Sequence, residues 1–236
     1  MSSPIRSTES VPPIDSDSSE TLTSRVYAWA RADVIAGRLK PGAKLKIEEL
    51  RERYDVGASP LREALSLLSS DGLVERIEQR GFRVANVSQE EFSDILKVRC
   101  WLEERALRES IAHGHSDWEE ALVLAGYRLS RQPRSKVPDG AFISNDQWEA
   151  RHKEFHMALI AACGSPTLLN YCKQLYDQNI RYRHVAGAAS YPQRDVANEH
   201  EEILQATLNR DVELATSRLI SHYTKTGAFL TEVLKA

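Results

Sequence analysis

From Ser88 to the C-terminus, the apolar residues of this chain recur only at helical spacing. Short stretches rich in glycine, proline and serine separate the helical segments. Helices that each carry one apolar face must bury those faces against one another, so residues 88–236 predict an all-α domain of about six helices. The predicted helices are 89–112, 116–130, 146–163, a helix that restarts at 164–166 and runs to about 185, 193–208 and 211–234.

Residues 20–87 follow a different pattern. Three helical stripes are followed by two β-like runs, with Gln79-Arg80-Gly81 between those runs as the tip of a hairpin. Ser59 is expected to cap the third helix and Pro60 to be its first residue. Helix, helix-turn-helix and hairpin within about 70 residues predict a winged helix-turn-helix domain. The segments are 22–35, 47–54, a helix from Ser59 to Asp71-Gly72, and the runs 73–77 and 82–87.

Composition narrows the class of protein. Residues 1–19 are rich in serine, proline and aspartate and have little to bury, so we expect a disordered tail without the features of a secretory signal. No apolar run approaches the ~20 residues of a membrane span. The three cysteines form no C-x-x-C pair, which favours buried free thiols in a reducing cytoplasm. The net charge of −3 does not argue against DNA binding, because basic residues can be concentrated on one surface.

The start of the third predicted helix carries the best candidate for reading DNA. Arg62 lies on the side away from the apolar stripe, where an arginine can contact guanine in the major groove. The alternative is a surface pair with Glu63. Ser59 and Pro60 begin the same helix. Further candidates, for phosphate or minor-groove contact or simply as solvated charges, lie at the hairpin tip and before the second helix. These are Arg80, Gly81, Arg83, Lys44 and Lys46.

Four of the seven histidines fall on the apolar stripes of three predicted helices. His152 and His156 lie four residues apart on one face, a spacing that offers two imidazoles to a metal ion. His200 and His222 lie on the stripes of the last two helices. Four such histidines can converge on a metal, or each can be a hydrogen-bonded core residue. The pattern leaves both interpretations open.

Arg99 lies on the apolar stripe of the helix 89–112, so its guanidinium is expected inside the bundle, where it needs an anion. Glu103, four residues on, can be that anion. A ligand carboxylate is the other interpretation. Arg181 and Tyr182 add hydrogen-bond donors on another helix and are candidates for the same ligand cavity.

One set of motifs runs through residues 20–87. It consists of Gly37-x-Leu39-x-Pro41-Gly42, Leu50, Ser59-Pro60-Leu61-Arg62-Glu63-Ala64-Leu65, Asp71-Gly72-Leu73-Val74 and Gly81-Phe82-x-Val84. This set resembles the GntR family of winged-helix regulators, which implies binding to operator DNA. Many members have Ser-Arg-Thr-Pro where this chain has Gly57-Ala58-Ser59-Pro60. The DNA contact of that arginine therefore cannot be carried over to Ala58, whereas Arg62 matches the family pattern.

A second set of motifs lies in residues 88–236. It consists of Arg99-x-x-x-Glu103, His156 ahead of Cys163-Gly164, Glu199-His200-x-x-Ile203, and His222 in the last helix. It resembles the FCD effector domain of the FadR-type branch. In that domain one Asp and three His commonly bind a divalent metal, often Zn or Ni, beside a ligand cavity, and the arginine contacts the effector. The resemblance implies that His156, His200 and His222 are metal ligands. His152 stands at the Asp position, so the site would carry one negative charge less.

A closer resemblance suggests the effector. Residues 54–65, 79–84, 118–119, 156–165 and 181–183 are similar to the carbon-starvation-induced repressors, which control catabolism of glutarate, γ-aminobutyrate or related carboxylates. This implies a small, glutarate-like carboxylate.

These features together predict a cytoplasmic, homodimeric repressor with no membrane partner. A palindromic operator and a small carboxylate would be its ligands. One alternative is a metal-dependent hydrolase on a helical bundle. It is disfavoured because Lys153 follows His152, where a zincin helix has Glu, and we expect no enzyme. The other alternative is a constitutive DNA-binding protein with a structural metal.

Overall fold

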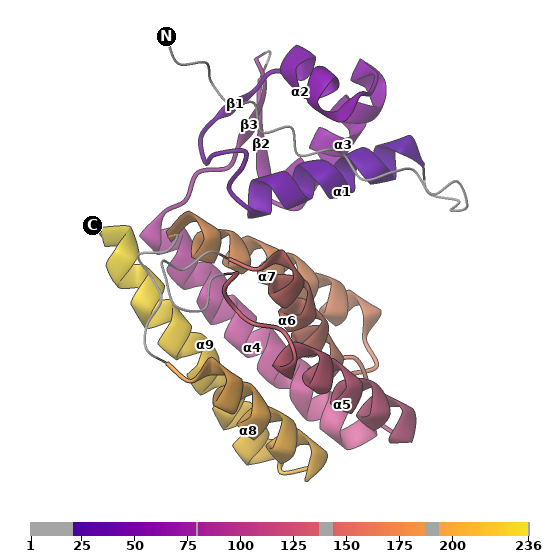
Figure 1. Cartoon of the computed structure of the whole chain (residues 1–236), viewed down its shortest axis with the longest axis vertical. Coiled ribbons are helices and arrows are strands. Elements are labelled where there is room, and N and C mark those ends of the chain that lie inside the picture. The colour runs from indigo at the N-terminus through magenta and orange to yellow at the C-terminus, as the bar shows by residue number, and fades with distance from the viewer. Residues whose placement is uncertain (1–20, 79, 137–143, 187–193, 236) are drawn as a thin grey trace.

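The computed structural model describes residues 21–78, 80–136, 144–186 and 194–235. They form a small N-terminal domain and a larger helical bundle, joined by the short segment between β3 (Gly81–Val84) and α4 (Gln89–His113) (Figure 1). This arrangement confirms the predicted mainly α fold. The tail predicted over residues 1–19 lies outside the described residues.

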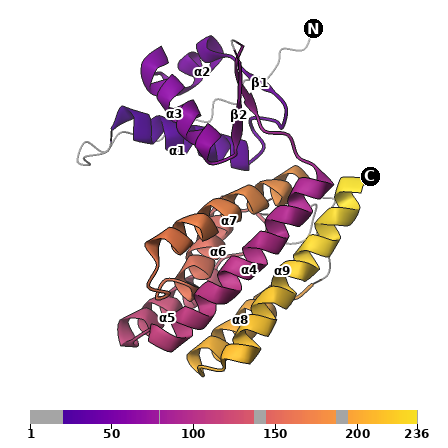
Figure 2. The same ribbon diagram turned by 180° about the vertical axis from the view of Figure 1, so that it is seen from behind.

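In the N-terminal domain, three helices pack against a small antiparallel sheet (Figure 2). The elements are α1 (Leu22–Ile35), α2 (Ile47–Tyr54), α3 (Ala58–Ser70), and the strands β1 (Lys44–Leu45), β2 (Val74–Ile77) and β3, in the sheet order β1-β3-β2. Leu61, Leu65 and Leu68 recur on one face of α3 and are fully buried against the core that includes Val26 and Phe82. Burial of this face leaves the opposite face of α3 exposed, which is the geometry of a winged helix-turn-helix.

The start of α3 differs from the prediction. The helix begins at Ala58, and Gly57 is its N-cap in extended conformation (φ −71°, ψ 163°). Ser59 therefore lies inside the first turn and does not cap the helix, and Pro60 is not its first residue. A proline fits anywhere in the first turn because the N–H groups there have no acceptor within the helix. The local sequence could not distinguish these positions.

Two features of this domain were missed in the sequence. β1 adds a third strand of only two residues, in which Lys44 pairs with Arg83 of β3. Asp33 of α1 is buried, although it interrupts an apolar stripe. Its carboxylate accepts hydrogen bonds from two side chains and forms an ion pair with a third, which ties α1 to α2 and to the turn between them. The partners are Arg38, Tyr54 and Arg53.

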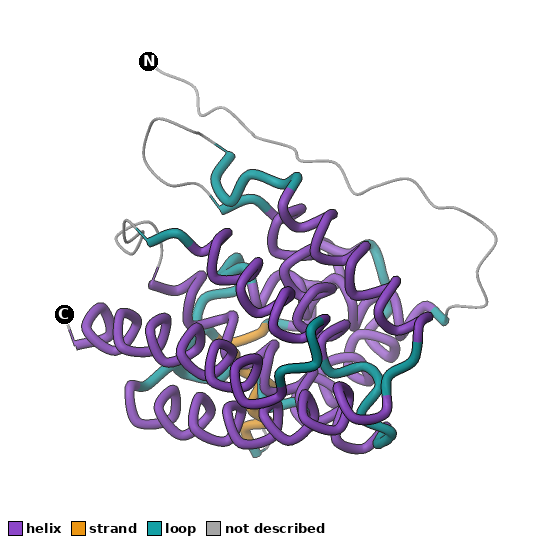
Figure 3. The backbone as a smooth tube through the Cα atoms, turned by 90° about the horizontal axis from the view of Figure 1, so that it is seen from below, coloured by secondary structure: helices purple, strands orange, loops and turns teal. Residues whose placement is uncertain are grey.

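The bundle contains six helices in the residues that the structure describes. Besides α4 they are α5 (Ser116–Ser130), α6 (Asp146–Leu159), α7 (Pro166–Ala186), α8 (Val196–Leu208) and α9 (Val212–Lys235). α4 packs against α7 and α9, while α5 packs against α6 and α8 against α9. The three strands all lie between Lys44 and Val84, and Figure 3 shows how much of the remaining chain is helical. This bundle confirms the predicted all-α C-terminal half.

Two helices are shorter than the sequence predicted, one at its C-terminal end and one at its N-terminal end. α6 ends at Leu159 and not at 163, because the chain turns at Ile160 and passes through Gly164, whose φ of +71° is left-handed. α8 begins at Val196, where the Asp195 side chain accepts a hydrogen bond from the Asn198 amide and caps the helix. Of the described helices, none is long and apolar enough to cross a membrane.

Candidate metal centre and DNA-binding surface

Four buried histidines converge at the centre of the bundle. α6 supplies His152 and His156, α8 supplies His200 and α9 supplies His222. One ring nitrogen of each lies within 4.8 Å of the corresponding atoms of the other three. The Nε2 atoms of His152 and His156 are 3.1 Å apart. The sequence had left open whether these side chains meet; the helix packing brings them to one point.

The outward-facing nitrogens of three histidines are held by other side chains. Nδ1 of His152 lies 2.6 Å from the Tyr176 hydroxyl, and Nδ1 of His156 lies 2.8 Å from the Tyr223 hydroxyl. Nδ1 of His222 lies 2.8 Å from a carboxylate oxygen of Glu199. Such contacts fix the ring orientation and the tautomer, and they leave Nε2 free to bind a metal, as in most histidine metal sites.

The electrostatics of the cluster favour neutral imidazoles. Burial, followed by the neighbouring positive charges, lowers the pKa of His152, His156 and His200 well below the usual value. Burial also lowers the pKa of His222 to about 4, despite the opposing effect of Glu199. A neutral imidazole is the form that binds metal, so these residues do not need to lose a proton first.

The cluster fits a divalent transition metal. In a tetrahedral site, Zn–N bonds of about 2.0–2.1 Å place the ligand nitrogens roughly 3.3–3.4 Å apart. The His152–His156 distance of 3.1 Å is close to that spacing. Imidazole ligands suit Zn²⁺ and Ni²⁺. Glu199 supplies a negative charge directly behind His222: its own burial raises its pKa, but hydrogen bonds from His222 and Arg194 outweigh burial and hold that pKa well below the usual range.

Arg99 points into the bundle, as its position on the stripe predicted, and it is 4% exposed. Its Nε donates to Glu103 at 2.6 Å and its Nη1 donates to Asn179 at 3.0 Å. The guanidinium also lies over the rings of Tyr176 and Tyr223. The internal pair with Glu103 therefore exists. It does not use the whole guanidinium, because Nη2 is buried and has no hydrogen-bond partner, and the same is true of Nδ2 of Asn179.

Glu103 is committed to protein partners. One carboxylate oxygen accepts from Arg99 and the other accepts from the Tyr223 hydroxyl. Its side chain is fully buried. Glu103 therefore orients Arg99 and, through Tyr223, His156.

A small cavity joins Arg99 to the histidines. Its volume is about 20 Å³, which is room for about one water molecule. The lining contains two arginines and no acidic residue. The polar residues that line it are Arg99, His152, Asn179, Arg183, His222, Tyr223 and Thr226, and the apolar ones are Phe92, Leu96 and Gly227.

Arg181 and Tyr182 do not line this cavity, which corrects the sequence-based assignment. Arg181 donates to the backbone carbonyl of Asn86, in the segment that joins the two domains. Tyr182 donates to Glu91, at the start of α4. On α7 these two residues fall on other faces than Arg183, which lines the cavity and pairs with Glu149 at 2.8 Å. Helical periodicity identified α7 as amphipathic but did not fix which face meets which neighbour.

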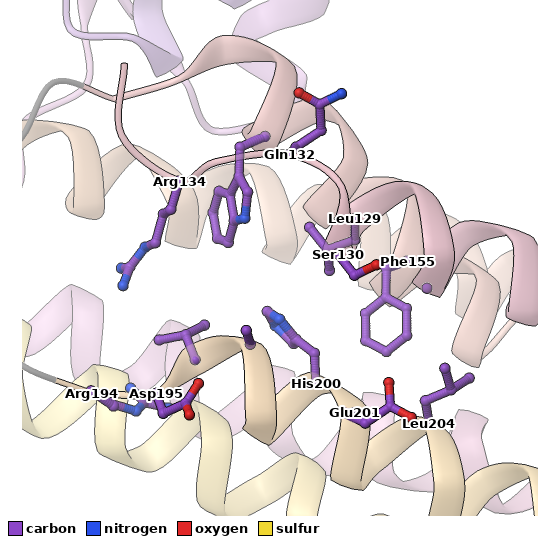
Figure 4. A pocket seen from close by; sticks show the side chains of 14 residues that line it. Leu129, Ser130, Gln132, Arg134, Phe155, Arg194, Asp195, His200, Glu201 and Leu204 are labelled. Atoms are coloured by element: carbon purple, nitrogen blue, oxygen red, sulfur yellow. The ribbon is translucent and has the colours of Figure 1, made fainter. Parts of the chain in front are cut away.

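A second, larger cavity of about 260 Å³ lies on the other side of His200, between α5, α6 and α8. Figure 4 shows His200 projecting from α8 toward it, with Phe155 and Arg134 across the gap. Trp148 lines it as well and stacks on His152 with ring centroids 4.5 Å apart. One member of the histidine cluster, His200, therefore borders a space much larger than the cavity beside Arg99.

The proposed DNA-reading residues lie on the surface of the N-terminal domain. Arg62 on α3 and Arg80 at the hairpin tip are exposed, and neither side chain forms an ion pair or hydrogen bond within the described residues. Arg83 is paired with Glu75 across the sheet at 2.5 Å, and Lys46 with Glu49 at 2.6 Å. Lys44 is likewise exposed and has no ion pair or side-chain hydrogen bond in the described residues, so Arg62, Arg80 and Lys44 are the unpaired cations among the candidates. Ser59 and Gly81 are close to Arg62 and Arg80 in the chain, at the start of α3 and of β3.

Together these features define a winged-helix DNA-binding domain joined to a helical bundle with a buried polar centre. Residues 22–84 match the gntR family of bacterial regulatory proteins, and residues 94–225 match the FCD domain. The chain therefore belongs to the GntR family of DNA-binding transcription regulators, in the group that carries an FCD domain.

Similar proteins agree with this assignment. The HTH-type transcriptional regulator BphR of Paraburkholderia xenovorans is 38% identical over 86% of this chain and 82% of its own length. The HTH-type transcriptional repressor GlaR of Escherichia coli (strain K12) is 34% identical over 83% of this chain and 90% of its own length. The solved structure of E. coli McbR/YncC has the same fold, with a TM-score of 0.75 and 22% sequence identity. The match covers 90% of this chain and 98% of that protein's chain. These relatives are regulators and not enzymes, as the sequence predicted.

Proposed function

We propose that this protein is a homodimeric cytoplasmic repressor that binds a palindromic operator and responds to a small carboxylate held between Arg99 and a metal ion. The name of the GlaR relative supports repression. Two copies would place two α3 helices in successive major grooves. Arg62 would contact a base in each half-site, and Arg80 the backbone or minor groove.

The metal in this proposal is Zn²⁺ or Ni²⁺, held by His152, His156, His200 and His222. Support comes from the convergence of four neutral imidazoles and from the partners that orient three of them. A bound ion would supply a positive charge and an open coordination position for a carboxylate oxygen. The negative charge of Glu199, whose carboxylate contacts Nδ1 of His222, would partly compensate for the aspartate that the family pattern has at position 152.

One observation carries the effector proposal. Nη2 of Arg99 and Nδ2 of Asn179 are buried donors without partners, and both residues line the same cavity as His152 and His222. Unsatisfied buried donors are rare and costly, so a site that collects two of them beside arginines and no acid is suited to an anion. A carboxylate would accept from both donors.

The size of the cavity suggests how an effector changes the protein. About 20 Å³ accepts a carboxylate group at most, whereas the carbon chain of a glutarate-like dicarboxylate needs more room. Binding would therefore have to open the bundle around Phe92, Leu96 and Gly227, or extend past the histidines toward the larger cavity. A ligand that binds only an opened arrangement shifts the population toward it.

The test is elemental analysis of untagged, dialysed protein followed by a carboxylate screen. We expect about one zinc or nickel ion per chain. Binding to a DNA fragment selected from a random pool is then measured with and without C4 and C5 dicarboxylates. A metal-loaded protein whose DNA affinity no carboxylate changes would instead be a constitutive DNA-binding protein with a structural metal, and absence of metal would reject the metal site.

A further inference from the structure

α7 contacts both the histidine cluster and the DNA-binding domain, through two different faces. Tyr176 and Asn179 lie three residues apart and face the cluster, where they contact His152 and Arg99. Gln174 and Gln178 lie four residues apart on the other side, about 200° around the helix from Tyr176, and contact the end of α3. One rigid helix thus touches both sites.

The contact with α3 is made at its C-cap. Asp71 caps this helix, and Gln178 donates to its backbone carbonyl at 2.7 Å. Gln174 donates to one carboxylate oxygen of Asp71 at 3.3 Å, and Tyr27 of α1 donates to the other at 2.5 Å. A Cβ atom at Gly72 would lie 2.7 Å from Nε2 of Gln178, which shows how closely α7 approaches this turn. The helix that carries Arg62 is therefore held at its far end by α7.

A second connection runs through Asp177. Its carboxylate is buried, accepts from Lys153 at 2.6 Å, and is paired with Arg31 of α1. Lys153 directly follows His152 in α6. Asp177 thus links the helix that carries two of the histidines to the first helix of the DNA-binding domain. Both connections use neighbouring turns of α7.

We infer that α7 is the relay between the two sites: a displacement of Tyr176 and Asn179 at the cluster moves Gln174, Asp177 and Gln178, and with them Asp71 and α3. This inference rests on the proposed function, in which the cluster and Arg99 form the regulatory site. The physical reason is that residues on adjacent turns of one packed helix move together. The residues hydrogen-bonded to the two faces of α7 are the ones to which its displacement is transmitted. The relay acts on the orientation of α3 and not on its contacts with DNA.

The test is hydrogen exchange on the full chain, read at the amides of Asp71, Gly72 and Leu73, which bond to carbonyls in the last turns of α3. Five proteins are compared with added Zn²⁺ and with EDTA. They are wild type, a Gln174→Ala/Gln178→Ala double variant, an Asn179→Ala variant, a triple variant that combines these three substitutions, and Gln205→Ala as a control. Gln205 is an exposed glutamine on α8 that bonds within its own helix. Zinc content is measured on the same samples.

In wild type, we expect Zn²⁺ to change exchange at these amides by about fivefold, the effect of one hydrogen bond on a local opening. The zinc effect should disappear in the double variant and persist in Gln205→Ala. A zinc effect of equal size in the double variant would overturn the relay, as would bound zinc with no effect in wild type. If no zinc binds, the metal proposal fails separately, and the Asn179→Ala variant tests the relay. Exchange at wild-type rates in Asn179→Ala would overturn the relay. Faster exchange in Asn179→Ala that is absent when the same substitution is made in the double variant would support it.

Discussion

Nδ1 of His156 lies 2.8 Å from the hydroxyl of Tyr223, and that hydroxyl in turn donates to Glu103. Because the Tyr223 hydroxyl donates its proton to Glu103, the hydroxyl oxygen can accept a hydrogen bond from His156. This places the ring proton of His156 on Nδ1 and its lone pair on Nε2. A residue of α9 and an acid of α4 therefore set the orientation of a candidate metal ligand on α6. Glu103 also accepts a hydrogen bond from Arg99. One residue therefore positions both a candidate metal ligand and the arginine proposed to bind the anion.

Tyr223→Phe should weaken metal binding without removing a ligand. Loss of an outer hydrogen bond to a ligating histidine typically costs about 10–100-fold in metal affinity. The measurement is competition with a chromophoric zinc chelator. Tyr127→Phe, on an exposed tyrosine of α5, is the matched control and should bind zinc as wild type does. An unchanged affinity in Tyr223→Phe would mean that His156 does not need this support.

A His152→Ala/His200→Ala double variant should lose the metal. Two of the four imidazoles would be missing, and the remaining pair cannot complete a four-ligand site. Metal content per chain, measured after dialysis, should fall from about one to near zero. His113→Ala removes an exposed histidine at the end of α4 and should keep the wild-type metal content. Metal that remains in the double variant would place the ion elsewhere.

Arg99→Ala should retain specific DNA binding but lose the response to carboxylates. Glu103 would be left buried without its cationic partner, so we also expect destabilisation of about 3–5 kcal/mol in urea unfolding. DNA affinity is measured with and without the carboxylate that acts on wild type, at a temperature where the variant is folded. Arg105→Ala, on the exposed side of the same helix, should respond normally. A normal response of Arg99→Ala would remove Arg99 from the effector site.

Arg62→Ala should lose specific operator binding while the fold remains intact. A bidentate arginine–guanine contact contributes about 1–3 kcal/mol of discrimination in each half-site. Fluorescence anisotropy with a selected operator and a scrambled fragment measures the difference, and thermal unfolding checks the fold. Arg80→Ala should instead weaken binding to both fragments and reduce the salt dependence, as expected for a phosphate contact. Specific binding by Arg62→Ala at wild-type strength would contradict the role of Arg62.

The sequence by itself determined the outline of this protein. Helical spacing after Ser88 and the helix, helix-turn-helix and hairpin order before it fixed the two kinds of domain, because periodicity reports which face of each element is buried. For the same reason the interior positions of Arg99 and the four histidines were predictable. Turn and cap signals placed several helix ends correctly, but not the first turn of α3, where glycine, serine and proline all fit.

Only the tertiary structure decided which side chains meet. Local periodicity does not contain the rotation of one helix against another, so it could not show that Tyr176, Tyr223 and Glu199 hold the histidines. It could not show that Arg181 faces the interdomain segment while Arg183 lines the cavity. Whether Arg99 pairs with Glu103 or keeps a donor for an anion was also undecided, and packing permits both, because the guanidinium has more donors than its protein neighbours can satisfy.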